Sequence, residues 1–248
     1  MSWRPLQVVN VKNCENNYAV ILLNFSLDFI EPSDENHFYH IWDNASIRIA
    51  VDGGANYLKQ TFTSCKFPDI ISGDFDSIKP PVLEFFKQKN VKIIETPDQN
   101  ETDFTKAVKV LINEIEQSSI TIDRVLVLWS SCGRIDHIMS IVNTLYQMLD
   151  YTSIPLYLYN LNASLSWILK PGVEHRIEAN EKSSWCSLVP VGDACIVTTS
   201  GLRWNLNKKK LSFGSLISTS NEFDFINHKE VKVLTDKPIL WSMDIPKK

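Results

Sequence analysis

The hydrophobic pattern of the chain changes near residue 160, and this change constrains the fold more than any other feature. Before it, short apolar runs alternate with segments whose apolar residues recur every three or four positions. After it, short strand-like runs follow one another without a helical repeat. Because each pattern is typical of a different arrangement of layers, we predict two domains, α/β over residues 1–160 and all-β over residues 161–248.

The first part is expected to contain buried strands separated by amphipathic helices. The helical repeat is clearest between Phe104 and Ile115 and again between Ile138 and Leu149. Nearly continuous apolar strands between such helices are typical of a mostly parallel sheet covered on both faces, so we expect a Rossmann-like three-layer domain. The expected strands are Tyr18–Phe25, Ile47–Val51, Asp69–Ser72, Val91–Ile94, Arg124–Leu128 and Pro155–Tyr159.

The second part is predicted to form a β sandwich or barrel. Its apolar runs are short, and Pro-Gly, Val-Gly-Asp and Ser-Gly breaks separate them. The expected strands are Ser164–Leu169, His175–Ile177, Trp185–Pro190, Ala194–Thr199, Lys210–Ser220, Glu230–Leu234 and Ile239–Met243.

The charge balance and the cysteine pattern exclude several classes of protein. The net charge is −4 and the pI about 5.8, so no overall positive field would attract nucleic acid or anionic lipid. No apolar stretch is long enough to cross a bilayer, and the N-terminal residues lack the pattern of a secretory signal. The cysteine count is 5, and no pair has the C-x-x-C spacing, which favours reduced thiols and a cytoplasmic location.

Acidic residues follow four consecutive strands of the predicted sheet. Ligands of an open parallel sheet bind beyond the carboxyl ends of its strands, so these acids are candidate site residues. They suit Mg²⁺ with a polyphosphate, because Mg²⁺ prefers oxygen ligands and arginine can contact phosphate in a bidentate manner. If the segment after the third strand stays extended, Asp74 and Asp76 point to the same side and can reach one cation. The candidates are Asp52, Asp74, Asp76, Asp103 and the pair Arg134 and Asp136.

Each of these residues also has a purely structural interpretation. Gly53 and Gly54 allow phosphate to approach the backbone closely, but they would also suit an ordinary turn. Asp103 could simply stabilise the positive end of its helix, and Arg134 could be a solvated surface charge. The acids gather at one predicted edge of the sheet, which favours a magnesium–phosphate site. The P-loop and dinucleotide motifs are absent from the sequence, which excludes the standard NTPase and dinucleotide sites.

Ordered sequence blocks around these residues resemble the thiamine pyrophosphokinases, and the eukaryotic branch most of all. Each block alone is a weak signal, whereas their order over roughly residues 18–245 is specific. The blocks are 52–56 (DGGAN), 73–78 (GDFDSI), 96–99 (TPDQ) with 102–106 (TDFTK), 133–137 (GRIDH), 201–206 (GLRWNL) and 213–221 (FGSLISTSN).

The resemblance implies transfer of a diphosphate group from ATP to the hydroxyl of thiamine, which gives thiamine diphosphate and AMP. It also implies a homodimer with active sites at the subunit interface, and Mg²⁺ among Asp74, Asp76 and Asp103. Either Asp103 or Asp136 could take the hydroxyl proton, and the sequence does not choose between them. The residues expected near ATP, its phosphates or the reacting hydroxyl are Asp52, Gly53, Gly54, Asn56, Gln99, Thr102, Arg134 and Asp136. Those expected to hold thiamine are Trp204, Ser218 and Asn221; an aromatic face suits its cationic ring.

One block departs from the family pattern. Residues 129–132 read Trp-Ser-Ser-Cys where the family usually has a glycine-rich run, and larger side chains there could narrow the space for phosphate. Two alternatives to the main interpretation follow. The chain could be a thiamine-binding regulatory protein whose catalysis has lapsed, or an ATP-dependent transferase that acts on another alcohol. The intact acids favour an active enzyme.

Overall fold

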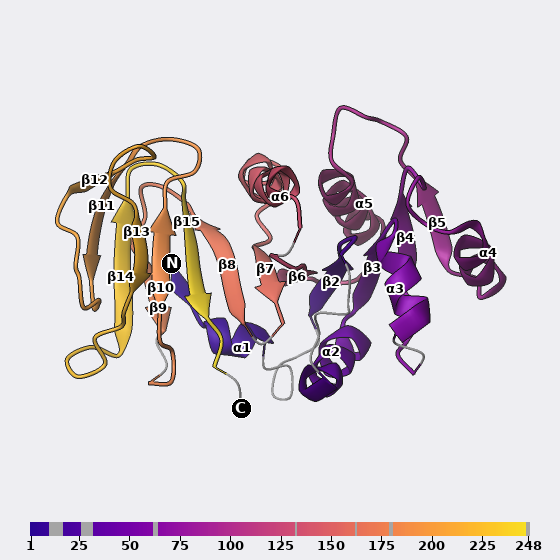
Figure 1. Ribbon diagram of the computed structural model, residues 1–248, viewed down its shortest axis with the longest axis horizontal. Helices are drawn as coiled ribbons and strands as arrows, with labels where there is room; N and C mark the ends of the chain where they lie inside the picture. The colour runs from indigo at the N-terminus through magenta and orange to yellow at the C-terminus, as the bar shows by residue number, and fades with distance from the viewer. Residues whose placement is uncertain are drawn as a thin grey trace. The chain divides into compact units, whose positions relative to one another are not determined.

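The chain divides into two compact units (Figure 1). The computed structural model describes residues 1–9, 17–25, 32–61, 64–131, 133–161, 163–178 and 181–246. Residues 11–161 form an α/β unit, and residues 1–10 join residues 162–248 in a β unit. The first ten residues thus depart from the predicted division, because strand β1 (Ser2–Trp3) pairs in parallel with β9 (His175–Glu178). Figure 1 shows the indigo N-terminal segment beside orange and yellow strands.

The α/β unit is built on strands in the order β7-β6-β2-β3-β4-β5, and each neighbouring pair runs parallel. The central strands are apolar and almost entirely buried, which is typical of a parallel sheet covered on both faces. Each predicted strand of this part is present, with ends shifted by at most a few residues. The strands are β2 (Tyr18–Leu22), β3 (Ile47–Val51), β4 (Ile70–Gly73), β5 (Lys92–Glu95), β6 (Arg124–Leu128) and β7 (Leu156–Asn160).

Helices connect these strands, and three of them were not predicted. Helix α5 begins after Thr102, whose hydroxyl oxygen accepts a hydrogen bond from the Thr105 backbone N–H at 3.1 Å. Helix α4 has prolines in its first turn, where their missing N–H groups cost nothing. The helices are α2 (Pro32–Asn44), α3 (Gly54–Thr61), α4 (Pro80–Gln88), α5 (Asp103–Gln117) and α6 (Ile135–Gln147).

The strand order brings the carboxyl ends of β3, β4 and β5 to one edge of the sheet. Parallel strands joined by helices all point the same way, so the residues that follow them meet at that edge. Within the described part of the chain, no helix combines the length and apolar character needed to span a membrane.

The β unit contains two sheets that pack face to face. One has the order β1-β9-β14-β11-β12, and the β unit's other strands run in the order β13-β10-β15-β8. Buried and less buried residues alternate along β14 and β15, as expected for strands with one face in a core. Trp3 of the first sheet lies 5.5 Å, between ring centroids, from Trp167 of the second, and Trp167 lies 6.2 Å from Trp241. These contacts identify a sandwich with an aromatic core.

The strands of the β unit follow the predicted runs, except that β1 was not predicted and that one run is divided. The run Lys210–Ser220 was expected to be a single strand, but a turn divides it. Gly214 has φ 76, and the Ser212 backbone N–H donates to the Leu216 carbonyl at 2.9 Å, so the chain reverses there. After β1 comes the short helix α1 (Pro5–Val9). The other strands are β8 (Ser164–Leu169), β9, β10 (Cys186–Val189), β11 (Cys195–Ser200), β12 (Lys209–Leu211), β13 (Ser218–Asn221), β14 (Glu230–Thr235) and β15 (Ile239–Asp244).

Candidate active site

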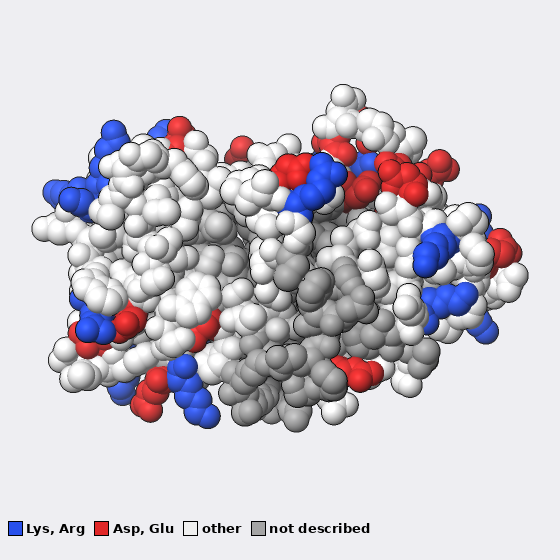
Figure 2. All heavy atoms as spheres, in the orientation of Figure 1, with Lys and Arg blue, Asp and Glu red and all other residues white. Residues whose placement is uncertain are grey.

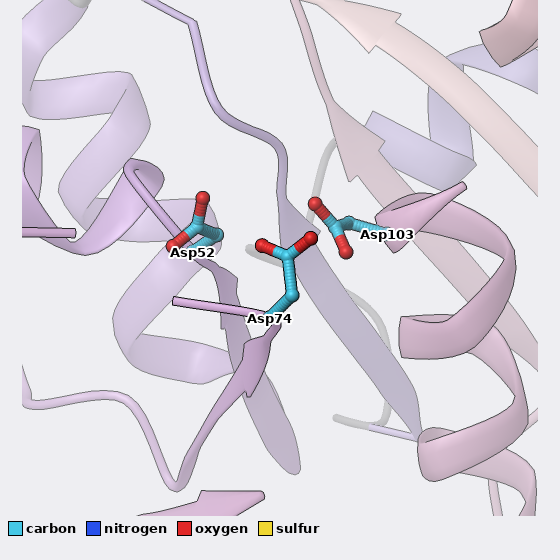
Figure 3. Close-up of side chains that lie close together, drawn as sticks. All are labelled: Asp52, Asp74 and Asp103. Atoms are coloured by element: carbon cyan, nitrogen blue, oxygen red, sulfur yellow. The ribbon is translucent and has the colours of Figure 1, made fainter. Parts of the chain in front are cut away.

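Three carboxylates meet at the carboxyl edge of the parallel sheet (Figure 3). Asp52 follows β3, Asp74 follows β4, and Asp103 opens α5. One oxygen from each lies within 4.8 Å of the others. We call this group the acid cluster. Carboxylate oxygens are the donors that a hard divalent cation such as Mg²⁺ prefers, so the donor set fits such an ion.

Asp52 is the buried member of the acid cluster, with only 1% of its surface exposed. Its two carboxylate oxygens accept hydrogen bonds from the backbone N–H groups of Ser77 at 3.2 Å and Ile78 at 3.0 Å. Burial raises the pKa of Asp52, and the hydrogen bond from the Ile78 backbone acts in the opposite direction. Gly73 allows the close approach of the two loops, because a Cβ there would lie 2.8 Å from the Cβ of Asp52. The structure therefore holds a buried acid in a fixed orientation.

Asp74 is oriented by a neighbouring amide. The Gln99 Nε2 donates to Asp74 Oδ2 at 2.9 Å, and this hydrogen bond lowers the pKa of Asp74. The segment that follows is not extended, because Phe75 has φ 64 and turns the chain. Asp76 is consequently not a member of the acid cluster, and its Oδ1 accepts a hydrogen bond from the Ser77 hydroxyl at 2.7 Å. The geometry groups Asp52, rather than Asp76, with Asp74 and Asp103.

Asp103 is paired with a lysine that the sequence analysis did not single out. The Lys106 side chain is only 6% exposed, and its Nζ lies 2.7 Å from Asp103 Oδ1. The same ammonium donates to the carbonyls of Thr96 at 2.7 Å and Asp98 at 3.0 Å. Lys106 therefore ties the first turn of α5 to the loop that carries Gln99. The sequence did contain a signal for this pair, because Lys106 follows Asp103 by about one helical turn.

Several residues expected near ATP hold the loops around the acid cluster. Asn56 Nδ2 donates to the Ser77 carbonyl at 3.0 Å, and its Oδ1 accepts from the Lys79 backbone N–H at 2.9 Å. Thr102 caps α5. A Cβ at Gly54 would lie 2.9 Å from the Leu23 carbonyl oxygen, and a Cβ at Gly53 would lie 2.5 Å from a neighbouring side-chain atom. The Gly54 position is therefore too crowded for a larger residue, because the atom that it would meet belongs to the backbone. Contact of these residues with a nucleotide stays a prediction.

Arg134 and Asp136 pair with each other at the start of α6. The Arg134 Nε donates to Asp136 Oδ1 at 3.1 Å, and a second bond joins Arg134 to Asp136 Oδ2. This bidentate contact raises the pKa of Arg134 and lowers that of Asp136. Both side chains are exposed, and neither belongs to the acid cluster. Of the unusual run before them, Trp129 is buried, and Cys132 lies outside the described residues.

The candidate thiamine residues also lie together, in the β unit. Asn221 is 3% exposed; its Oδ1 accepts from the Trp204 backbone N–H at 3.3 Å, and its Nδ2 donates to the Trp204 carbonyl at 2.9 Å. The Nδ2 also lies 3.3 Å from the Ser218 hydroxyl. The Trp204 side chain is 52% exposed, and the Arg203 guanidinium lies 4.7 Å from its ring centroid. We call these residues the Trp204 cluster. Trp204 thus presents an aromatic face that can attract a cation.

Sequence profiles of one protein family match both units. The profile described as "Thiamin pyrophosphokinase, catalytic domain" matches residues 38–158, and the one described as "Thiamin pyrophosphokinase, vitamin B1 binding domain" matches residues 174–240. The chain is 32% identical over 244 residues to thiamine pyrophosphokinase 1 of Oryza sativa subsp. japonica, which covers 92% of this chain and 87% of that protein. The chain belongs to the thiamine pyrophosphokinase family. Thiamin pyrophosphokinase 1 of Caenorhabditis elegans is 29% identical over 85% of this chain and 84% of its own length.

Solved structures of thiamin pyrophosphokinases share the fold. The yeast enzyme superposes with a TM-score of 0.82 at 23% identity, over 98% of this chain and 90% of that one. The enzyme from Candida albicans gives 0.78 at 23% identity, over 98% and 92%. These likenesses agree with a mixed α/β fold followed by a β domain.

Each of the two candidate clusters lies in the segment matched by a different family profile. The acid cluster lies in the segment matched by the catalytic profile, and the Trp204 cluster lies in the segment matched by the vitamin B1 binding profile. The chain is therefore an enzyme of the thiamine pyrophosphokinase family, with chemically distinct residue groups in its two units.

Proposed function

We propose that the chain transfers a diphosphate group from ATP to the hydroxyl of thiamine, forming thiamine diphosphate and AMP in the cytoplasm. The observation that carries this proposal is the acid cluster, which stands at the ligand-binding edge of a parallel sheet in a chain of this family. In this proposal the α/β unit acts as a Rossmann-like nucleotide-binding domain. The β unit supplies the surface for thiamine.

Asp52, Asp74 and Asp103 would hold Mg²⁺, and Asp76 would reach the same ion only if the turn at Phe75 opened. When bound, Mg²⁺ neutralises negative charge on phosphate oxygens, which is the main requirement of phosphoryl-type transfer. Gln99 and Lys106 would keep Asp74 and Asp103 in place, since each makes a direct polar contact with one of them.

Arg134 would balance negative charge on the transferred or leaving phosphate oxygens. It can do so because the guanidinium is exposed and its partner, Asp136, is a surface carboxylate with which phosphate can compete. The hydroxyl proton of thiamine would pass to Asp136 or Asp103. Gly53, Gly54, Asn56 and Thr102 would shape the loop and the helix start around the phosphates.

Thiamine would lie on the face of Trp204, with Ser218 and Asn221 beside it. The Arg203 guanidinium already occupies a position over that ring, as a cationic thiazolium would. A half-exposed tryptophan offers one wall of a site, and a second subunit could supply another, which supports a homodimer with the active site at its interface. Sedimentation velocity on the purified chain tests the dimer.

The deciding experiment follows AMP and thiamine diphosphate together in purified protein given ATP, Mg²⁺ and thiamine. We expect both products in equal amounts and complete loss of both when a chelator removes the metal. Thiamine binding without either product would identify a regulatory protein whose catalysis has lapsed. AMP formation with a different alcohol, but not with thiamine, would identify a related transferase.

A further inference from the structure

A pocket of about 340 Å³ lies at the opposite edge of the parallel sheet from the acid cluster. Residues 65–68, which line it, lead into β4, whereas Asp74 follows that strand. The other lining residues come from α3, from α4 and from Lys89, which ends α4. We call this the amino-edge pocket. The length of β4 and the direction of the parallel strands separate it from the proposed catalytic centre.

The walls of the amino-edge pocket are largely aromatic. The ring centroids of Phe67 and Phe85 lie 5.8 Å apart, and those of Phe85 and Phe86 lie 5.2 Å apart, in edge-to-face arrangements. Phe86 and Leu58 are buried, whereas Phe67 is 44% exposed. An exposed aromatic ring above a buried apolar floor leaves apolar surface that a ligand could cover.

Three lysines line the amino-edge pocket together with these rings. Lys59 Nζ lies 4.4 Å and Lys89 Nζ 5.9 Å from the centroid of the Phe85 ring. Lys66 Nζ donates to the main-chain carbonyl of Asp43 at 2.6 Å, while the Asp43 carboxylate accepts from the Lys66 backbone N–H. Within the part of the chain that the structure describes, none of the three lysines forms an ion pair with a carboxylate. Even with Asp43 nearby, the charge around the pocket is positive.

Figure 2 shows the same separation of charge on the visible face. Basic side chains gather beside α3 and α4, and acidic side chains gather along the edge above β4 and β5. The lysines of the amino-edge pocket thus lie apart from the acid cluster.

We propose that the amino-edge pocket binds a small aromatic anion, with its ring system between the phenylalanines and its carboxylate, sulfonate or phosphate group at the lysines. The volume is at the lower end of the roughly 300–1000 Å³ usual for ligand sites, so it suits a compact aromatic molecule and not a long acyl chain. The aromatic walls favour a flat ring, and the lysines select against a neutral or cationic one such as thiamine.

Titration of the full chain with anilinonaphthalene sulfonate, a fluorescent aromatic anion, tests this proposal. We expect saturable fluorescence at one site and affinity that falls with added salt, because the lysines are at the surface. The double variant Lys59→Glu with Lys89→Glu should bind at least about tenfold more weakly, since two charge-assisted contacts become repulsive. Lys87→Glu is the control: it makes the charge change of one of these two substitutions, on α4, at a residue that does not line the pocket.

Turnover of ATP and thiamine by the double variant serves as the check that it is folded. A second measurement needs no variant: peptide mapping after maleimide treatment should show that the probe protects Cys65, a thiol in the pocket wall, from alkylation. Equal affinity of the double variant and the wild-type chain, or alkylation of Cys65 that the probe does not slow, would overturn the proposal.

Discussion

The acid cluster and the Trp204 cluster use their polar side chains in opposite ways. In the acid cluster the carboxylates are the candidate ligands, and neighbours such as Gln99 and Lys106 orient them. In the Trp204 cluster the buried side chain of Asn221 holds the backbone of Trp204, and the aromatic ring is left half-exposed. One group presents charge in a fixed geometry, and the other presents an apolar face from a fixed stretch of backbone.

This difference separates catalysis from binding. Gathered carboxylates repel one another, so the protein gains by keeping them together only if a cation or a proton compensates. An exposed tryptophan requires no compensation, and removing it should affect a ligand more than the fold. Substitutions in the two clusters are therefore expected to change different measured quantities.

The largest effect is expected for Asp74→Asn, which removes one charge from the acid cluster with little change in shape. We predict that kcat falls at least about 100-fold while the KM for thiamine changes little, because charge neutralisation at the phosphates is lost. Steady-state AMP formation measures both constants. Asp76→Asn is the matched control, since Asp76 lies outside the cluster. If Asp76→Asn proves the more damaging of the two, Asp76 joins the metal during turnover and the grouping seen here is not the catalytic one.

Lys106→Met should lower both activity and stability. The substitution removes the ion-pair partner of Asp103 and the donor to two carbonyls, so we expect about a tenfold loss in kcat and about 2 kcal/mol less free energy of unfolding. Urea denaturation and AMP formation measure the two. Lys109→Met, on the same helix, removes a lysine from a more exposed pair with Glu101 and should cost less than about 0.5 kcal/mol. An equal loss of unfolding free energy in the two variants would show that the burial of Lys106 does not make its ion pair more stabilising than the exposed one.

Trp204→Ala is expected to raise the KM for thiamine about tenfold and to leave the free energy of unfolding within about 0.5 kcal/mol. Asn221→Ala, by contrast, should lower the free energy of unfolding by about 1–3 kcal/mol, because it removes a buried side chain that bonds both the backbone N–H and the carbonyl of Trp204. Thiamine titration and urea denaturation of both variants give the comparison. A Trp204→Ala chain as unstable as Asn221→Ala would show that the ring supports the fold rather than the ligand.

The smallest effect is a pH dependence of stability in the β unit. His175 is buried; its Nδ1 accepts from Trp3 Nε1 at 2.9 Å, and its Nε2 lies 2.8 Å from the Lys170 carbonyl. Burial lowers the pKa of His175 below its ordinary value of about 6.5, so the unfolded chain binds the proton more tightly. The contribution of neutral His175 to the free energy of unfolding should therefore be fully present above about pH 6.5. It should fall as the pH drops toward the lowered pKa. The midpoint urea concentration of unfolding, measured as a function of pH, should fall with decreasing pH in the wild-type chain. It should fall less in the His175→Gln variant.

The sequence predicted the strands of the α/β unit because apolar runs that are buried on both faces leave a clear pattern, as at Ile47–Val51. It missed α3, which begins at a pair of glycines that also suit a turn, and α4, whose prolines could equally end a segment. The division of Lys210–Ser220 depended on the conformation of Gly214, which a run of strand-like residues conceals.

The candidate site was predictable where it depended on strand ends, and not where it depended on a single backbone angle. Asp52, Asp74 and Asp103 all follow predicted strands, so their meeting follows from the parallel topology. The exclusion of Asp76 depends on a positive φ at Phe75, a conformation that phenylalanine rarely adopts. The pairing of Lys106 with Asp103 could be read from their spacing, whereas its contacts with the loop that carries Gln99 could not.

The pairing of β1 with β9 has a consequence for the order in which the protein folds. Residues 2 and 3 precede the α/β unit in the chain, whereas their partners, residues 176 and 177, are made only after that unit. Domains tend to fold as they emerge during synthesis, and contacts between distant residues form slowly. The α/β unit can thus reach its structure while the first strand is still unpaired. The β unit is completed only afterwards, when β9 becomes available to pair with β1.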